Sequence, residues 1–402
     1  MLFDPQRHER LTGVRWNADA ARAAIDAIVG EALARFTPDR LWPAHPLDHE
    51  DSDPPPYTGL YLGAAGVIWA LDWLARRGFP GARHDFVPSL DELAARNLAR
   101  YESSGDGVES LLIGRAGILL LHHRLAPSAA VADRLAASIA ANTDHPSQEM
   151  LWGAPGTMHA ALAMHERTGE ERWAELFRAG ARALSASLAY SPDAGCHLWT
   201  QHVHGKRPQY IGAGHGFAGN ASALVRGRAL LPRDEWTHWA DRIVETTQAT
   251  ALRDGAHANW PAYVVPPGSA PRMLVQWCHG APGMVTSLAD LADPRLDALL
   301  VAAGELVWAA GPLTKGPGLC HGTAGNGCAF LKLFRRTGDA MWLDRARAFA
   351  MHAVAQSERH AQEYGMRRCT LWTGDLGLAI YLCNCLDGGD HWPSLDREEP
   401  GV

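Results

Sequence analysis

The chain has 402 residues, of which 47% are hydrophobic, enough to fill one large core or two ordinary ones. Its net charge is −7, and Lys and Arg occur only in short, isolated clusters, which argues against a nucleic-acid partner. No apolar run approaches the roughly 20 residues that a membrane-spanning helix needs. The charged N-terminus lacks the apolar stretch of a signal peptide, so the sequence predicts a cytoplasmic protein with no membrane partner.

A short glycine motif recurs seven times along the chain. It reads Gly-x-x-Gly and continues as an apolar run with helical spacing, at intervals of roughly 40 to 65 residues. The leading glycines, in chain order, are Gly63, Gly114, Gly153, Gly216, Gly280, Gly322 and Gly374. Intervals of this size are typical of repeat proteins in which each unit supplies about two helices.

Amphipathic segments rich in Ala, Leu, Arg and Glu, which are good helix formers, lie between the motifs. Their apolar residues recur at helical spacing. Examples, in chain order, are residues 17–36, 90–101, 170–190, 235–252, 294–310 and 341–356. Strand signals are nearly absent, and the one tempting stretch, residues 263–265, is enclosed by prolines.

The pattern therefore predicts two helices in each repeat, one apolar helix that begins at the glycine motif and one amphipathic helix. Apolar helices are normally buried and amphipathic helices border the solvent, so the repeats predict two layers of helices. Seven pairs closed into a ring give an all-α fold, a seven-fold α/α toroid, as a single domain over residues 1–402. The same pattern is compatible with an open helical solenoid.

Three of the motifs carry side chains suited to metal binding. His215 precedes the leading glycine of the fourth motif, Cys278 and His279 that of the fifth, and Cys320 and His321 that of the sixth. If the motifs meet at one end of a ring, these side chains meet as well. Catalytic zinc sites use three protein ligands, often thiolates and imidazoles, so two cysteines and a histidine here form a candidate zinc site. The alternative is that each cysteine is only a small residue at a tight junction.

Two histidines are left over at these junctions. His215 and His279 could each transfer a proton near neutral pH. His215 is the only such residue in its motif and is the first choice for a general acid or base, although a lone histidine in a tight turn is commonly structural.

Several charged residues near the last two motifs are further candidates. Lys315 stands shortly before Cys320 and could bind a carboxylate, although a surface lysine is usually just solvated. Arg367 and Arg368 are ambiguous in the same way. Asp375 could orient a histidine or cap its own helix, and capping is the favoured interpretation.

The motifs WCHGAPG, LCHGTAGNG and GHGFAGN resemble the signatures of the lanthionine synthetase C-like family, LanC and its relatives. The resemblance extends over all seven glycine motifs. It implies a seven-fold α/α toroid with one zinc ion at its axis, held by Cys278, Cys320 and His321. It also implies that His215 is the acid/base residue.

The resemblance implies an activity as well. LanC cyclases add a peptide cysteine to dehydroalanine or dehydrobutyrine, and LanC-like relatives bind glutathione and add it to dehydroamino acids of damaged proteins. His279, Lys315 and the pair Arg367 and Arg368 resemble features of this second branch. The implied function is a zinc-dependent enzyme that joins glutathione or a peptide thiol to a dehydroamino-acid-containing peptide or protein.

Departures from the family pattern leave alternatives open. Before the second motif, where lantibiotic cyclases often carry an Asp, the acidic residue is Glu109, and Leu274 stands where they often carry an Arg. The alternatives are a dedicated lanthipeptide cyclase acting with a dehydratase, and a non-catalytic zinc protein that binds glutathione or a partner. A carbohydrate-active α/α barrel is disfavoured, because such sites need paired carboxylates.

Overall fold

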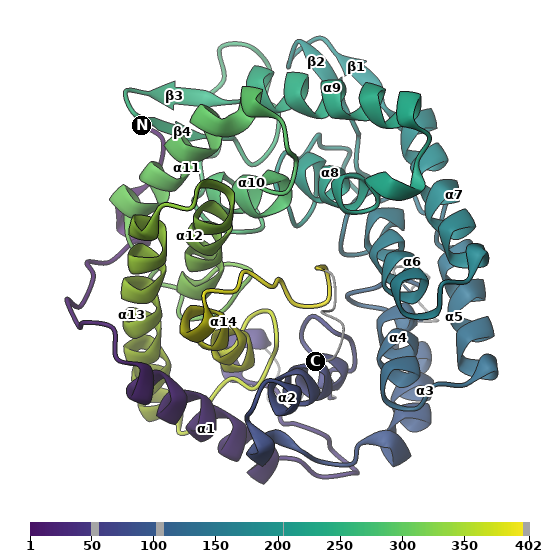
Figure 1. Cartoon of the computed structure of the whole chain (residues 1–402), viewed down its shortest axis with the longest axis vertical. Coiled ribbons are helices and arrows are strands. Elements are labelled where there is room, and N and C mark those ends of the chain that lie inside the picture. Colours follow the sequence, from purple (N-terminus) through teal and green to yellow (C-terminus); the bar gives the residue numbers. More distant parts are fainter. Residues whose placement is uncertain (50–55, 102–107, 204, 397–402) are drawn as a thin grey trace.

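The computed structural model describes residues 1–49, 56–101, 108–203 and 205–396. In these ranges the chain forms fourteen α-helices and two short antiparallel hairpins, arranged as two concentric layers of helices (Figure 1). The inner layer consists of α2 (Ala64–Arg76), α4 (Arg115–Leu125), α6 (Ala154–Thr168), α8 (Phe217–Arg226), α10 (Ala281–Leu288), α12 (Thr323–Thr337) and α14 (Asp375–Asp387). The outer layer consists of α1 (Ala18–Ala34), α3 (Leu90–Tyr101), α5 (Ala129–Ala141), α7 (Glu171–Ser187), α9 (Arg233–Ala249), α11 (Asp297–Ala310) and α13 (Ala340–Tyr364).

The seven glycine motifs are the starts of the seven inner helices. In each motif the leading glycine is the residue that caps the helix N-terminus. The second glycine is also required by crowding, because an added Cβ would lie 1.7 to 2.3 Å from a carbonyl oxygen of the preceding turn. Gly280 shows a conformational need too, since its φ of +104° is a region that side chains rarely adopt.

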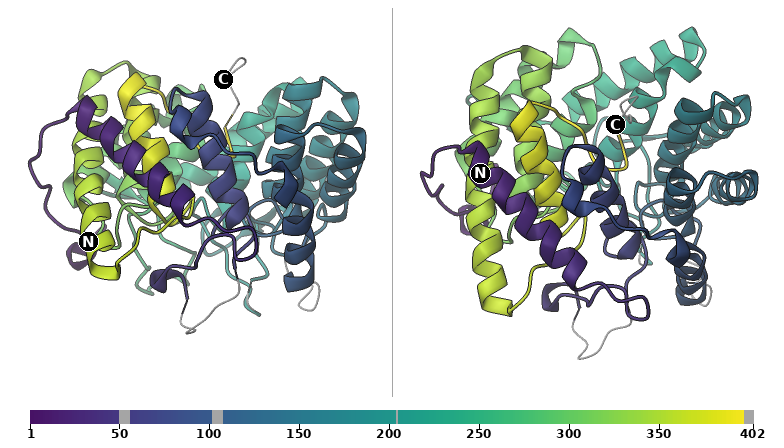
Figure 2. Two further views of the ribbon diagram at one scale, coloured as in Figure 1. Left: turned by 90° about the horizontal axis from the view of Figure 1, so that it is seen from below. Right: turned by 60° about the horizontal axis from the view of Figure 1, so that its bottom comes forward.

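The inner helices form a closed ring. Each contacts the next one along the chain, and α14 contacts α2, which joins the last repeat to the first. The outer helices pack behind them, and α1, near the N-terminus, covers α14 (Figures 1 and 2). The prediction of an α/α toroid is confirmed, and an open solenoid is excluded. The prediction of a single domain over residues 1–402 stays a prediction.

The strands are short and lie between helices. β1 (Ala189–Ser191) pairs with β2 (Cys196–Leu198), and β3 (Leu252–Asp254) pairs with β4 (His257–Asn259). Residues 263–265 form no strand, and Tyr263 makes only an isolated bridge to Tyr210. No helix in the described ranges is long and apolar enough to cross a membrane.

Residues 388–396, here called the axial segment, turn back from α14 into the middle of the ring (Figure 1). The Trp392 ring packs on Trp277 and Trp372, with centroids 5.4 and 5.8 Å away. The segment borders a cavity of about 810 Å³ at the C-terminal ends of several inner helices. Cys278, Cys320 and His321 are not among the residues that line this cavity, although Trp277, the neighbour of Cys278 in sequence, is one of them.

Candidate metal centre

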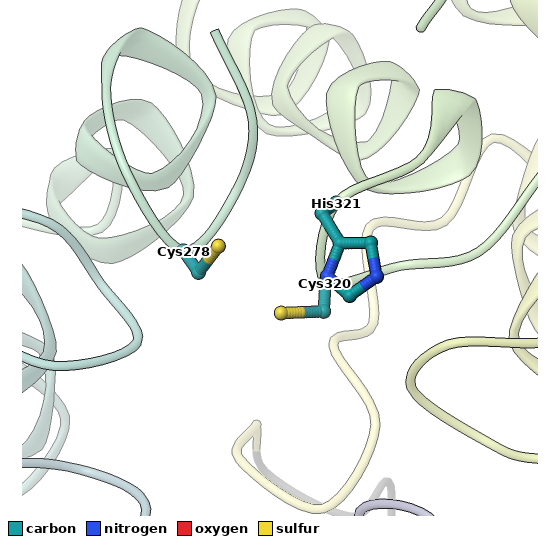
Figure 3. A group of neighbouring side chains, drawn as sticks. All are labelled: Cys278, Cys320 and His321. Atoms are coloured by element: carbon teal, nitrogen blue, oxygen red, sulfur yellow. The ribbon is translucent and has the colours of Figure 1, made fainter. Parts of the chain in front are cut away.

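Cys278, Cys320 and His321 converge at the starts of α10 and α12. One potential ligand atom from each lies within 4.8 Å of the others (Figure 3). Both cysteines are buried and His321 is half-buried. The two turns are joined directly, because the Cys278 backbone N–H donates a hydrogen bond of 3.1 Å to the Cys320 carbonyl. The packing of consecutive inner helices thus brings together ligands that lie one helix pair apart in sequence.

The donor set fits a zinc ion. Two thiols and one imidazole are ligands that zinc prefers, and three protein ligands are typical of catalytic zinc sites. A hydrogen bond from the Cys320 thiol lowers the pKa of Cys278, whereas burial raises the pKa of Cys320. A cation at this point would favour the thiolate form of both residues. In the described part of the chain no other group of three or more His, Cys, Asp or Glu side chains has this arrangement.

Each of the two sulfur atoms also has a polar neighbour. The Gln276 Nε2 group donates to Cys278 Sγ at 3.0 Å. The Tyr61 hydroxyl, from the turn before α2, interacts with Cys320 and lowers the pKa of its thiol against the larger effect of burial. These contacts were not predicted from the sequence, because neither residue belongs to the repeated part of a motif.

His215 lies beside this cluster and is held by a carboxylate. Its Nδ1 atom is 3.0 Å from Oε2 of Glu149, which is completely buried. Glu149 also accepts hydrogen bonds from the backbone N–H groups of Leu151 and Trp152. An ionised carboxylate can only accept, so the proton of this pair resides on Nδ1, and Nε2 is left to exchange a proton with a substrate.

The two histidines at the site differ in their pKa shifts. Burial lowers the pKa of His215, but the hydrogen bond and charge of Glu149, with the charge of Cys278, outweigh it, so the net pKa is raised. Burial also lowers the pKa of His279, and because burial outweighs the opposing charge of Cys278, the net pKa of His279 is lowered. The two rings stack with centroids 5.9 Å apart, and Trp152 stacks on His215 at 5.6 Å. His215 is therefore the better proton donor.

Glu149 is the functional residue that sequence reasoning missed. It comes from the turn before α6, whereas the acidic candidate considered was Glu109. Glu109 forms an ion pair with Arg115 and accepts a hydrogen bond from Ser138. The available signal was an acidic residue directly before the third glycine motif, but Glu109 stands in a similar place before the second motif, so sequence position alone did not distinguish the two.

The charged candidates near the last two motifs occupy different surroundings. Lys315 is exposed. Burial raises the pKa of the Cys320 thiol, and the positive charge of Lys315 partly offsets this effect. The Arg367 guanidinium contacts Glu31 and Ser357, whereas that of Arg368 pairs with Asp48.

Asp375 stabilises the turn before its own helix. Its Oδ2 atom accepts the backbone N–H of Arg368 at 2.8 Å, and burial raises its pKa to about 6. The carboxylate thus holds the turn that leads into α14 and has no hydrogen bond to a histidine. Contrary to the capping interpretation, the N-cap of α14 is Gly374, and no side-chain hydrogen bond caps the helix.

The fold and the site thus define an α/α toroid with a candidate Cys-Cys-His metal site at the starts of its inner helices. Comparison with known proteins is more specific: the family model described as lanthionine synthetase C-like protein matches residues 47–397. The chain belongs to the lanthionine synthetase C-like family.

Individual relatives match only part of the chain, at modest sequence identity. The chain is 32% identical over 215 residues to LanC-like protein GCL1 of Arabidopsis thaliana, covering 51% of this chain and 47% of the relative. It is 32% identical over 184 residues to glutathione S-transferase LANCL1 of Danio rerio, covering 44% and 43%. Each match therefore spans less than half of the relative. The solved structure of nisin cyclase has the same fold, with a TM-score of 0.62 and 15% identity over 92% of this chain and 94% of that chain.

Proposed function

We propose that this protein is a zinc-dependent enzyme that forms a thioether by adding a thiol to a dehydroalanine or dehydrobutyrine residue. The observation that carries the proposal is the Cys278, Cys320 and His321 cluster with the His215–Glu149 pair beside it. A thiol-binding metal site and an adjacent proton donor are the two parts that conjugate addition needs. Two relatives or fold neighbours are named a glutathione S-transferase and a cyclase, which supports thiol chemistry.

The proposed site residues divide the reaction between them. Cys278, Cys320 and His321 would hold the zinc ion, which when bound lowers the pKa of the substrate thiol. The thiolate sulfur bonds to the β-carbon of the dehydroamino acid, and the π electrons move toward the carbonyl as an enolate. His215 then donates its Nε2 proton to the α-carbon. The proton that the thiol released balances the one that His215 gives up.

The surroundings of His215 suit this step. Glu149 fixes the orientation of the ring and stabilises its protonated form, so the acid is available near neutral pH. His279, whose pKa is lowered by burial, stacks on His215 as a neutral ring and adds no second positive charge.

The proposed thiol donor is glutathione or a peptide cysteine, and the acceptor is a dehydroamino-acid-containing peptide or protein. Lys315 is the best placed of the three basic candidates to bind a glutathione carboxylate, because it is exposed and its charge acts on the Cys320 thiol. Arg367 and Arg368 are proposed to contribute less to this binding, because Glu31 and Asp48 already offset the charges of their guanidinium groups.

The test is to mix the zinc-loaded protein with glutathione and a short dehydroalanine peptide and to follow the peptide mass, with Cys320→Ala as control. We expect an adduct that forms faster with the intact protein and not with the control. Adduct formation by Cys320→Ala at the normal rate would refute the mechanism. Cyclisation of a dehydrated precursor peptide without glutathione addition would support the cyclase alternative, and glutathione binding without turnover would support a non-catalytic role.

A further inference from the structure

The N-terminal arm, residues 3–12, connects the two loops that carry the cysteines. On one side, Nη2 of Arg7 donates to Oε1 of Gln276 at 3.2 Å, in the turn before α10. On the other side, the Arg7 carbonyl accepts the Thr314 backbone N–H at 3.0 Å, in the loop before α12. Residues distant in sequence therefore meet next to Cys278 and Cys320.

The orientation of the Gln276 amide follows from these contacts. An arginine side chain has donors and no acceptor, so it must face the amide oxygen. The amide NH₂ group then points the other way, toward Cys278 Sγ at 3.0 Å. Gln276 is only 6% exposed, and its backbone is fixed by paired hydrogen bonds with His279. The side chain has little freedom to turn away from the sulfur.

A donor in this position matters for the charge of the site. Two thiolate ligands already concentrate negative charge at a buried point, and a substrate thiolate brings a third. An N–H group that hydrogen-bonds to sulfur stabilises the negative charge there, and a cation behind the amide polarises it further. Arg7 and Gln276 form such a chain, and it ends on Cys278.

We propose that Gln276, held by Arg7, is a positioning residue that sets the affinity of this site for an incoming thiolate. The inference rests on the proposed thiol-binding function. It assigns to the N-terminal arm a role at the reaction centre that the glycine motifs do not reveal.

The test uses the full-length protein loaded with Co²⁺, because thiolate-to-cobalt absorption reports sulfur ligands without any turnover. Glutathione and 2-mercaptoethanol, which has no carboxylate, are titrated separately into the wild type, Gln276→Leu and Gln276→Glu. Both variants lack an N–H donor for the sulfur, but glutamate keeps the shape of glutamine and can still pair with Arg7. We expect both to need about ten- to a hundredfold more of either thiol to reach the bound spectrum.

Two further variants complete the design. Gln201→Leu removes another fully buried amide, one that accepts from the Tyr210 backbone, and should titrate like the wild type. Arg7→Met should weaken the binding of both thiols, but by a smaller factor than the Gln276 variants do. In this variant the Gln276 amide stays beside the sulfur and loses only the neighbouring cation.

The outcomes that contradict the inference are specific. If Gln276→Glu titrates like the wild type while Gln276→Leu is impaired, side-chain shape matters and the donor does not. An Arg7→Met effect seen with glutathione alone would mean that Arg7 binds the peptide directly. Unchanged titrations of both Gln276 variants would overturn the inference and leave the proposed function standing. A wild-type protein with no thiol-dependent band would overturn the proposed function itself.

Discussion

At the scale of single residues, the candidate site combines two groups with opposite electrical character. The two cysteines are negative in their thiolate form, whereas Glu149 favours the protonated, positive form of His215. The carboxylate comes from the turn before α6 and the histidine from the turn before α8, so neighbouring repeats together form the proposed proton donor.

Replacing Glu149 with glutamine should change the pH dependence of thioether formation. The acid form of His215 exists below its pKa and is lost as the pH rises through it. Removal of the Glu149 charge lowers this pKa, so the falling limb of kcat should move to lower pH by about one unit. The measurement is the pH profile of adduct formation.

Glu109→Gln is the matched control for this change, because its carboxylate pairs with Arg115. Its profile should coincide with that of the wild type. A Glu149→Gln profile with an unmoved limb would show that His215 is not the group titrating in catalysis.

Zinc content should separate the ligand cysteines from the other buried ones. Cys278→Ala and Cys320→Ala each remove one of three ligands, so we expect neither variant to retain stoichiometric zinc after dialysis. Cys328→Ala, a buried cysteine on α12, should retain it. Elemental analysis of the purified proteins decides the matter, and full zinc retention in Cys320→Ala would contradict the assignment.

The candidate metal ligands could be predicted from the sequence, but their polar neighbours could not. The three candidate ligands lie together because all of them stand at equivalent points of a repeat, and a repeat is visible in sequence. Glu149, Gln276 and Tyr61 could not be assigned in this way. The roles of Glu149 and Tyr61 depend on which turns lie side by side in the ring, and that of Gln276 depends on the conformation of its own turn.

At the scale of helices and turns, the glycine motif is a packing device. The chain makes a tight turn, starts an inner helix, and leaves no space for a Cβ at the junction. This crowding is local in sequence, which is why the starts of all seven inner helices were predictable. The outer helix α5 was not among the predicted segments, because its surface is largely alanine, which suits either layer.

Gly280→Ala should destabilise the fold measurably. The new Cβ would lie 2.0 Å from the Leu274 carbonyl oxygen at a backbone φ of +104°. Strain of this kind costs about 1–3 kcal/mol before the clash is counted. Urea unfolding followed by circular dichroism would measure the loss.

Gly30→Ala provides the contrast, because Gly30 is exposed within α1 and nothing lies near its added Cβ. The free energy of unfolding should stay constant or rise by about 0.5–1 kcal/mol. Equal destabilisation by the two substitutions would contradict the crowding argument.

At the scale of the whole molecule, the axial segment ties the middle of the ring together. Lys332 of α12 is almost completely buried and contacts Asp290, Asp390 and Asp396, the last two from this segment. No repeat signal marks residues 388–396, so the sequence did not predict their return into the ring.

Lys332→Met should therefore cost far more stability than loss of a surface ion pair. It leaves three carboxylates without their buried cation, and breaking a buried pair typically costs about 3–5 kcal/mol. Arg96→Met, which breaks the exposed contact with Glu92, should cost about 0–1 kcal/mol. Unfolding free energies of the two variants that agree within error would contradict this role for Lys332.

The contact between α1 and α14 has a consequence for how the protein is made. The buried face of α1, including Ile25, Ile28 and Val29, is covered in part by a helix that the ribosome synthesises more than 300 residues later. Contacts between such distant segments form slowly, and an apolar face that waits for its partner is prone to aggregation. We therefore expect α1 to gain its full set of contacts only after the seventh motif has been synthesised.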